Sequence, residues 1–240
     1  MMAFSPMEQF EIYYYGFISN VIFYLLVAVM IMIIVNLSIA RRTQILVGNW
    51  WTVLNESIYH TLLEIATDYI GKTNGLLYFT LIYSIFYLVL FSNLIGLIPY
   101  SSTTTVEIVI TLAAAFTLLV GVLAVGFISH RFELLAAFIP AGTPLGLIPL
   151  MILLELLAYF TRTLSLGLRL AVNMITGHIL AKVCVGFIWV AIYVDSPKFI
   201  VALPMLLLTL FLGLEILIAY LQAYIFTFIT SITIKDLYYL

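Results

Sequence analysis

The chain has 240 residues, of which only 8% are charged and 65% are hydrophobic. Because a soluble domain carries about 25% charged residues, this composition excludes a soluble globular protein and indicates an integral membrane protein. It also disfavours a β-barrel, which needs alternating polar residues to line its lumen. The formal net charge of −2 has the wrong sign and size for nucleic-acid binding.

The N-terminal residues lack the features of a cleavable leader. Between Met1 and Glu11 there are two acidic residues and no basic one, which is the opposite of a signal n-region or a transit peptide. We therefore expect direct membrane insertion with at most slight trimming.

Three uncharged segments, each longer than the roughly 20 residues that a spanning helix needs, predict membrane spans near 17–40, 76–98 and 108–129. Pro99 ends the second of these spans, and a short polar turn follows it. We expect the second and third spans to form a hairpin.

Residues 48–72, between the first two spans, predict an amphipathic helix on the membrane surface. Charged and apolar side chains share this stretch at mostly helical spacing, and Trp50 and Trp51 suit the headgroup level. A polar connector that packs on a partner protein is the alternative. Basic residues such as Arg41 and Lys72 mark this side as the inner one, which places the N-terminus outside.

The segment 138–149 contains three prolines and two glycines. This composition disfavours a continuous helix and predicts an apolar re-entrant or interfacial loop, which needs surrounding protein to satisfy its backbone.

Two long hydrophobic helices are predicted over 147–190 and 199–234, and both carry ionisable residues, which usually mark function at membrane depth. At about 100° per residue, one face of the first helix collects a polar stripe of Glu155, Arg162, Arg169, Asn173 and Thr176, with Ser165 at its edge. His178 and Lys182 fall on the opposite face of the same helix. On the second helix, Glu215 and Gln222 share a face.

These residue types suggest proton handling. An arginine stays charged because its pKa exceeds about 12, whereas carboxylates and a histidine can be tuned to exchange protons near neutral pH. The alternative is that the charges form structural ion pairs, such as one between Glu155 and Arg162 on their shared face. Arg169 has no acidic residue three or four positions away, so we expect its partner on another chain.

One motif is highly specific: Leu164–Leu170 reads LSLGLRL and is followed by Asn173, Gly177 and His178. In this motif the chain resembles subunit a of F-type ATP synthases, of the mitochondrial type. Further motifs resemble the same family and extend the likeness over nearly the whole chain: Ser5–Ile12, Ser92–Tyr100, Phe138–Leu145, and Leu214-Glu-Ile followed by Gln222, Ala223 and Tyr224.

The resemblance implies a stator that faces a rotating ring of subunits c. It implies that Arg169 is the essential arginine opposite a ring carboxylate, and that Glu215 and His178 line the proton entry half-channel. The exit half-channel would be lined by Glu155 and Asp236. The polar neighbours of the arginine would be Asn173, Gln222, Ser165 and Arg162.

The fold expected on these grounds is an all-α integral membrane protein with about five membrane-embedded helices and one interfacial helix. The last two helices would form a long, strongly tilted hairpin. The implied partners are the ring of subunits c, the peripheral stalk and other membrane subunits, with protons carried through and no cofactor or metal bound. The chain would lie in the mitochondrial inner membrane, with its N-terminus in the intermembrane space and its C-terminus on the matrix side. It would not be an enzyme by itself, since it lacks the glycine-rich loop of a nucleotide site.

Two other functional classes fit less well. A haem-binding electron-transfer subunit needs paired histidines on facing helices, but His60, His130 and His178 lie one to a segment. An autonomous channel or secondary transporter often shows internal repeats, and the sequence shows none. The single cysteine, Cys184, excludes an internal disulfide and fits a small buried hydrophobe.

Overall fold

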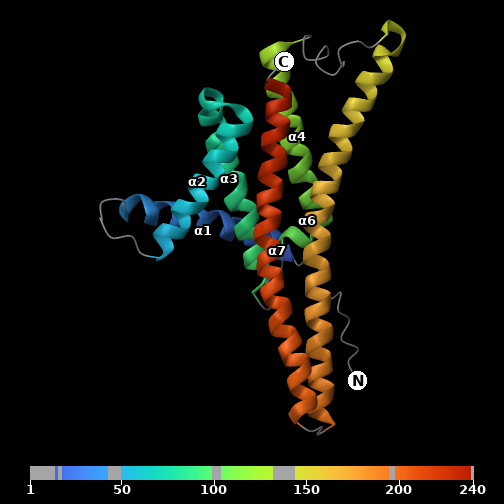
Figure 1. Ribbon diagram of the computed structural model, residues 1–240. Coiled ribbons are helices and arrows are strands. Elements are labelled where there is room, and N and C mark those ends of the chain that lie inside the picture. The colour runs from blue at the N-terminus through green and yellow to red at the C-terminus, as the bar shows by residue number, and fades with distance from the viewer. Residues whose placement is uncertain are drawn as a thin grey trace.

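The chain is almost entirely helical over the residues that the computed structural model describes, which are 14–15, 18–42, 50–98, 104–131, 144–194 and 198–238 (Figure 1). The exception is a short antiparallel pair of two-residue strands, β1 (Tyr14–Tyr15) and β2 (Ile18–Ser19). The predicted all-α class is therefore confirmed. The motif at 5–12 and most of the predicted loop at 138–149 lie outside the described residues.

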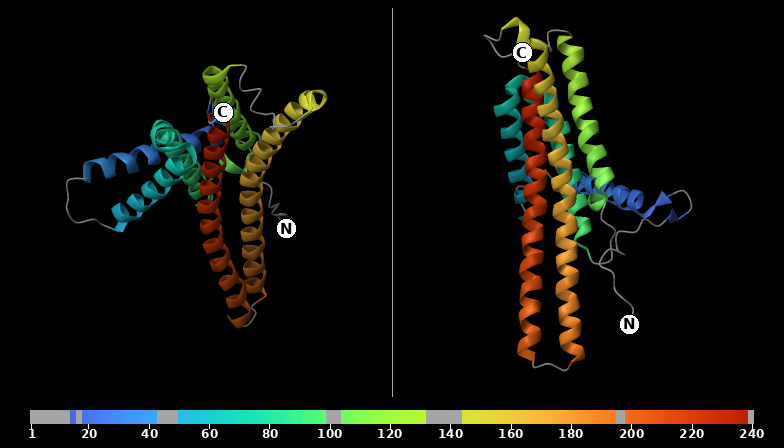
Figure 2. Two further views of the ribbon diagram at one scale, coloured as in Figure 1. Left: turned by 45° about the horizontal axis from the view of Figure 1, so that its top comes forward. Right: turned by 90° about the vertical axis from the view of Figure 1, so that its right-hand side faces the viewer.

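Helix α1 (Asn20–Arg42) extends sideways from the other helices, as Figures 1 and 2 show. The Ser19 hydroxyl accepts a hydrogen bond from the Ile22 backbone N–H at 3.4 Å, which caps the start of the helix. Further along, the Tyr83 hydroxyl of α3 donates to Asn36 Oδ1 at 2.7 Å. This side-chain bond joins α1 to the helix against which it packs.

Helices α2 (Trp50–Ile70) and α3 (Lys72–Gly96) are joined by a single residue, Gly71. Its φ of 93° lies in a region that glycine adopts without steric cost. At Gly75 the helices touch so closely that an added Cβ would lie 2.6 Å from the Ala66 carbonyl oxygen. Small residues at these two positions therefore allow the sharp turn and the tight packing that follows it.

Helix α2 has the two-faced character that its sequence predicts. Trp50 and Trp51 are 89% and 73% exposed. Beyond this first turn, one face of the helix is buried and consists of Ile58, Leu62, Ile65, Ala66 and Ile70, whereas Glu56, His60 and Glu64 are exposed. This face contributes to the main hydrophobic core, which also draws residues from α3, α4, α6 and α7. Its location at a membrane surface stays a prediction.

The turn η2 (Thr104–Val106) precedes helix α4 (Ile108–His130), which packs against both α6 and α7. Gly167 of α6 permits the close approach of α4, because an added Cβ there would meet Leu112 Cδ2 at 3.0 Å and the Thr111 carbonyl oxygen at 3.2 Å.

The last two helices form the long hairpin that the sequence predicts. After the short turn η3 (Leu145–Leu147), α6 (Ile148–Tyr193) and α7 (Lys198–Tyr238) run antiparallel, with α2 and α3 beside α7 (Figures 1 and 2). Among the described residues, five helices are long and apolar enough to cross a membrane: α1, α3, α4, α6 and α7. Helix α6 carries all the members of the predicted polar stripe and His178 as well.

Candidate functional site

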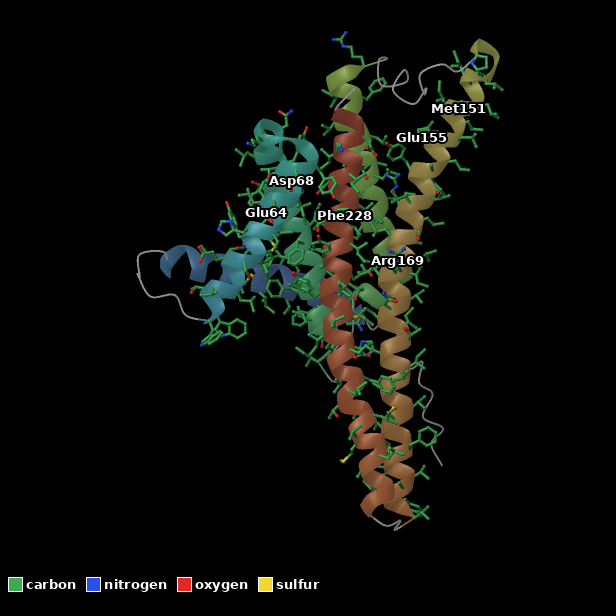
Figure 3. The ribbon with its side chains drawn as sticks, viewed as in Figure 1. Glu64, Asp68, Met151, Glu155, Arg169 and Phe228 are labelled. Carbon is green, nitrogen blue, oxygen red and sulfur yellow. The ribbon has the colours of Figure 1, made fainter. Side chains whose placement is uncertain are left out.

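Arg169 lies about midway along α6, as Figure 3 shows, and its side chain is exposed. It lines a hollow of about 420 Å³ whose walls all come from this helix: Thr161, Leu164, Ser165, Leu168, Arg169, Val172 and Asn173. The ion pair among the described residues joins Arg162 to Asp236, and Arg169 has no acidic partner in this part of the chain. A fixed positive charge thus faces an open, partly polar surface.

The polar stripe of α6 meets α7 one turn beyond Arg169. Asn173 Nδ2 donates a hydrogen bond to Gln222 Oε1 at 3.3 Å. Gln222 is only 3% exposed. The bond links the two helices of the hairpin beside the arginine, as a polar pair expected to join helices in an apolar medium.

Glu215 packs directly on α6 at Gly177. A Cβ added at Gly177 would overlap Glu215 Oε1 and would lie 2.9 Å from Glu215 Cδ. His178 is the next residue of α6, and both ionisable side chains are partly buried. Because Gly177 has no side chain, the carboxylate of α7 can approach the backbone of α6 at the residue that precedes His178.

Near the C-terminal end of α7, Asp236 is held by two side chains of α6. Arg162 Nη1 lies 3.6 Å from Asp236 Oδ2, and the Tyr159 hydroxyl donates to the same oxygen at 3.4 Å. The Arg162 guanidinium also sits over the Tyr159 ring, 5.3 Å from its centroid. Arg162 therefore pairs across the hairpin with Asp236, and not along its own helix with Glu155, as one alternative from the sequence had it.

The predicted site residues thus fall into pairs that the sequence did not specify. Asn173 meets Gln222, and Arg162 meets Asp236. Glu155 is partly buried one turn before Tyr159 and makes no described ion pair. Tyr159 was missed, although its position three residues before Arg162 places it on the neighbouring helix surface.

The ionisable groups of α6 are spread along its axis. At 1.5 Å per residue, His178 lies about 14 Å from Arg169, and Glu155 lies about 21 Å from it in the other direction. Ionisable side chains therefore lie on both sides of Arg169 along the helix. No cluster of three or more side chains suited to a metal ion occurs among the described residues.

Known proteins resemble this chain over nearly its whole length. The protein family described as ATP synthase A chain matches residues 21–235. A protein of Podospora anserina named ATP synthase subunit a is 38% identical, over 97% of this chain and 92% of its own length. A protein of the same name from Neurospora crassa is 38% identical, over 97% of this chain and 93% of its own length. Another, from Brassica napus, is 37% identical, over 98% of this chain and 96% of its own length.

Proposed function

The chain belongs to the ATP synthase A chain family, the proton-translocating stator subunits of the membrane sector, and on that premise we propose that its α6–α7 hairpin lines two proton half-channels with Arg169 between them. As a member of this family it works together with other subunits of the ATP synthase. The specific partners that we propose are a ring of subunits c, which faces the hairpin, and the peripheral stalk with its neighbouring membrane subunits.

The observation that carries the proposal is the exposed Arg169 in its hollow on α6. Burial of a cation in an apolar medium is costly unless an opposite charge compensates it. A carboxylate on each ring subunit would supply that charge as the ring turns past. Because an arginine does not release its proton, it would also block direct proton leakage between the two half-channels.

The entry half-channel, in this proposal, uses Glu215 and His178. A proton passes from this pair to a ring carboxylate, and the neutral carboxyl group can then face lipid, where a carboxylate would be strongly disfavoured. The close packing of Glu215 on Gly177 supports this assignment, because it places the carboxylate against the residue of α6 that precedes His178.

The exit half-channel uses Glu155 and Asp236, which lie on the other side of Arg169 along the hairpin. After nearly a full turn, a ring carboxyl group reaches this side and loses its proton. Tyr159 and Arg162 keep Asp236 in place through the contacts at 3.4 and 3.6 Å. In this proposal Ser165 and Asn173, which line the same hollow as the arginine, give the ring carboxylate neutral polar partners as it passes. Gln222 keeps Asn173 in place through its hydrogen bond at 3.3 Å.

Proton flow through this route supplies the work of rotation. At 2.3 kcal/mol per 100 mV, one proton that crosses a potential of about 150 mV releases about 3.5 kcal/mol. The nucleotide chemistry belongs to other subunits, since we assign no nucleotide site or cofactor to this chain. We place it in the mitochondrial inner membrane, with the N-terminus in the intermembrane space and the C-terminus in the matrix.

The test is an Arg169→Ala substitution in the intact complex. We expect proton-driven ATP synthesis to fall below one hundredth of the wild-type rate while the complex still assembles, since one preorganised charge contributes about 100-fold or more to such a process. Arg131→Ala, at an exposed arginine after the end of α4, is the matched control and should be neutral. Synthesis at the wild-type rate in Arg169→Ala would contradict the role of this arginine.

A further inference from the structure

The last turn of α7 carries two exposed charged residues, Lys235 and Asp236. The residue before them, Ile234, is 4% exposed and belongs to the main hydrophobic core. Helix α7 ends at Tyr238, and the last turn of a helix frays easily because its carbonyl groups lack partners within the helix. Asp236 lies two residues before this end, so its orientation depends on the contacts that its turn makes with neighbouring helices.

The buried hydroxyl groups of the preceding turns do not supply these contacts. Those of Thr230, Ser231 and Thr233 donate to carbonyl oxygens four residues back in α7, at 2.7, 2.8 and 2.7 Å. Hydrogen bonds of this kind stay within one helix and tend to weaken or bend it. The end of α7 is therefore held to its neighbours through other side chains.

On the α2 side, the ring of Tyr69 contacts two residues of α7. It meets the Phe228 ring edge to face, with 5.1 Å between centroids and 84° between the planes. Lys235 Nζ lies 5.8 Å from the centroid of the same tyrosine ring. Phe228 and Lys235 are seven residues apart and so share one face of α7, and Figure 3 shows Phe228 beside the end of α2 that carries Asp68. One aromatic ring thus spans two turns of α7 and reaches the residue next to Asp236.

On the α6 side, Tyr159 and Arg162 contact Asp236 itself. The hydrogen bond from Tyr159 is long, at 3.4 Å. The ion pair with Arg162 joins side chains that are 39% and 37% exposed, and exposed pairs of this kind are weak. These contacts alone hold the carboxylate loosely, so the contact on the α2 side adds a restraint that the turn needs.

We propose that Tyr69 is a positioning residue for proton exit, which holds Lys235 against α2 and thereby keeps the neighbouring Asp236 directed toward α6. The inference rests on the proposed exit half-channel, since Asp236 is one of its two carboxylates. The face of an aromatic ring attracts a cation, and a group that accepts protons works well only when it is placed accurately. Helix α2 thus acts on the exit route through one side-chain contact.

The test compares variants of the intact complex in sealed vesicles, with ATP synthesis driven by an imposed proton gradient and normalised to assembled complex. Tyr69→Leu should slow synthesis about threefold, because an exposed cation–π contact shifts a population by a factor of about two to five. Lys235→Met, which removes the cation and keeps an apolar side chain, should slow synthesis as much. Tyr69→Phe keeps the ring and should retain most of the rate.

Tyr59→Leu is the matched control. Tyr59 belongs to the same helix, about 15 Å before Tyr69 along its axis, and its ring packs edge to face on Phe79 of α3 at 4.9 Å between centroids. Its loss removes a similar ring contact at a distance from Asp236, so synthesis should stay at the wild-type rate. Equal losses in Tyr59→Leu and Tyr69→Leu would show a general effect of packing and overturn the inference.

Asp236→Asn shows whether Tyr69 acts through Asp236. Adding Tyr69→Leu to Asp236→Asn should cause no further loss, whereas a merely structural role would slow the double variant further and overturn the inference. A wild-type rate in Tyr69→Leu, or a Tyr69→Phe variant as slow as Tyr69→Leu, would also overturn it.

The same variants separate the inference from the proposed function. If Asp236→Asn slows synthesis while Tyr69→Leu runs at the wild-type rate, only the inference fails. If Asp236→Asn runs at the wild-type rate, the proposed exit route fails. Should Tyr69→Leu not assemble, Lys235→Met decides, because its side chain is exposed: slow synthesis supports the inference, and a wild-type rate overturns it.

Discussion

Substitution of Gly177 by alanine would test whether the position of Glu215 controls proton entry. An added Cβ would overlap Glu215 Oε1 and would lie 2.9 Å from Cδ and 3.2 Å from Cγ. Ordinary contact begins at 3.4 Å, so the carboxyl carbon must retreat by about half an ångström and the oxygen by more. The obstacle is the end of a flexible side chain, so we expect the carboxylate to move while the helices stay packed.

The expected effect is a loss of rate with little loss of assembly. A displacement of 1 Å at a reacting group can lower a reaction rate about 100-fold. The Glu215 side chain can return transiently to its original position, so we expect the rate of synthesis to fall only about tenfold. The assay is ATP synthesis by reconstituted complex at a fixed proton gradient, normalised to the amount of assembled complex.

Two glycines of the same hairpin provide matched controls. A Cβ added at Gly186 of α6 or at Gly213 of α7 meets nothing within 4 Å, although Gly213 lies only two residues from Glu215. Both alanine variants should synthesise ATP at the wild-type rate. Adding Glu215→Asp to Gly177→Ala, which shortens the obstructing side chain, should restore part of the lost rate. A Gly177→Ala rate equal to that of Gly213→Ala would refute the reasoning.

Two further predictions concern the packing around the site. Gly75→Ala should destabilise the complex by about 1–3 kcal/mol, because the added Cβ would meet the rigid backbone of Ala66 and Thr67. Thermal unfolding measures this loss, and Gly121→Ala is the control, since a Cβ added at Gly121 meets open space. Equal stability of the two variants would count against the α2–α3 contact. A double-mutant cycle with Arg162→Gln and Asp236→Asn should give a coupling of only about 0.2–1 kcal/mol, because the two side chains are 39% and 37% exposed; no measurable coupling would mean that the pair does not form in the complex.

Much of the fold was predictable because helices in an apolar medium leave a clear record in the sequence. Uncharged segments gave the expectation of spans near 76–98 and 108–129, where the structure has α3 and α4. The hairpin expected over 147–190 and 199–234 corresponds to α6 and α7. The membrane placement of these segments stays a prediction, as do the roles of the individual site residues.

The family was also predictable, and the family match confirms the resemblance. The motif around Arg169 depends on residue type and spacing along one helix, which a sequence displays directly. This identification also argues against the haem-binding and transporter classes, neither of which explains an ATP synthase motif that extends over nearly the whole chain.

Contacts between helices were less accessible to sequence reasoning. Arg162 could have paired with Glu155 on its own helix, and only the antiparallel alignment of α6 and α7 brings it to Asp236. That alignment depends on how closely the helices approach, which small residues such as Gly177 permit. Asn93 on α3 shows the same dependence, since its sequence neighbours give no sign that its amide is buried with no hydrogen-bond partner among the described residues.

The sequence by itself therefore determined the helices, the family and the polar face of α6, because charge content and a period of 3.6 residues act within one segment. The tertiary structure decided which polar groups meet, from Glu215 on Gly177 to Asn173 with Gln222. The physical reason is that a pairing between two helices depends on their relative axial position. Side-chain volume at the contact sets that position, and spacing along either helix alone does not.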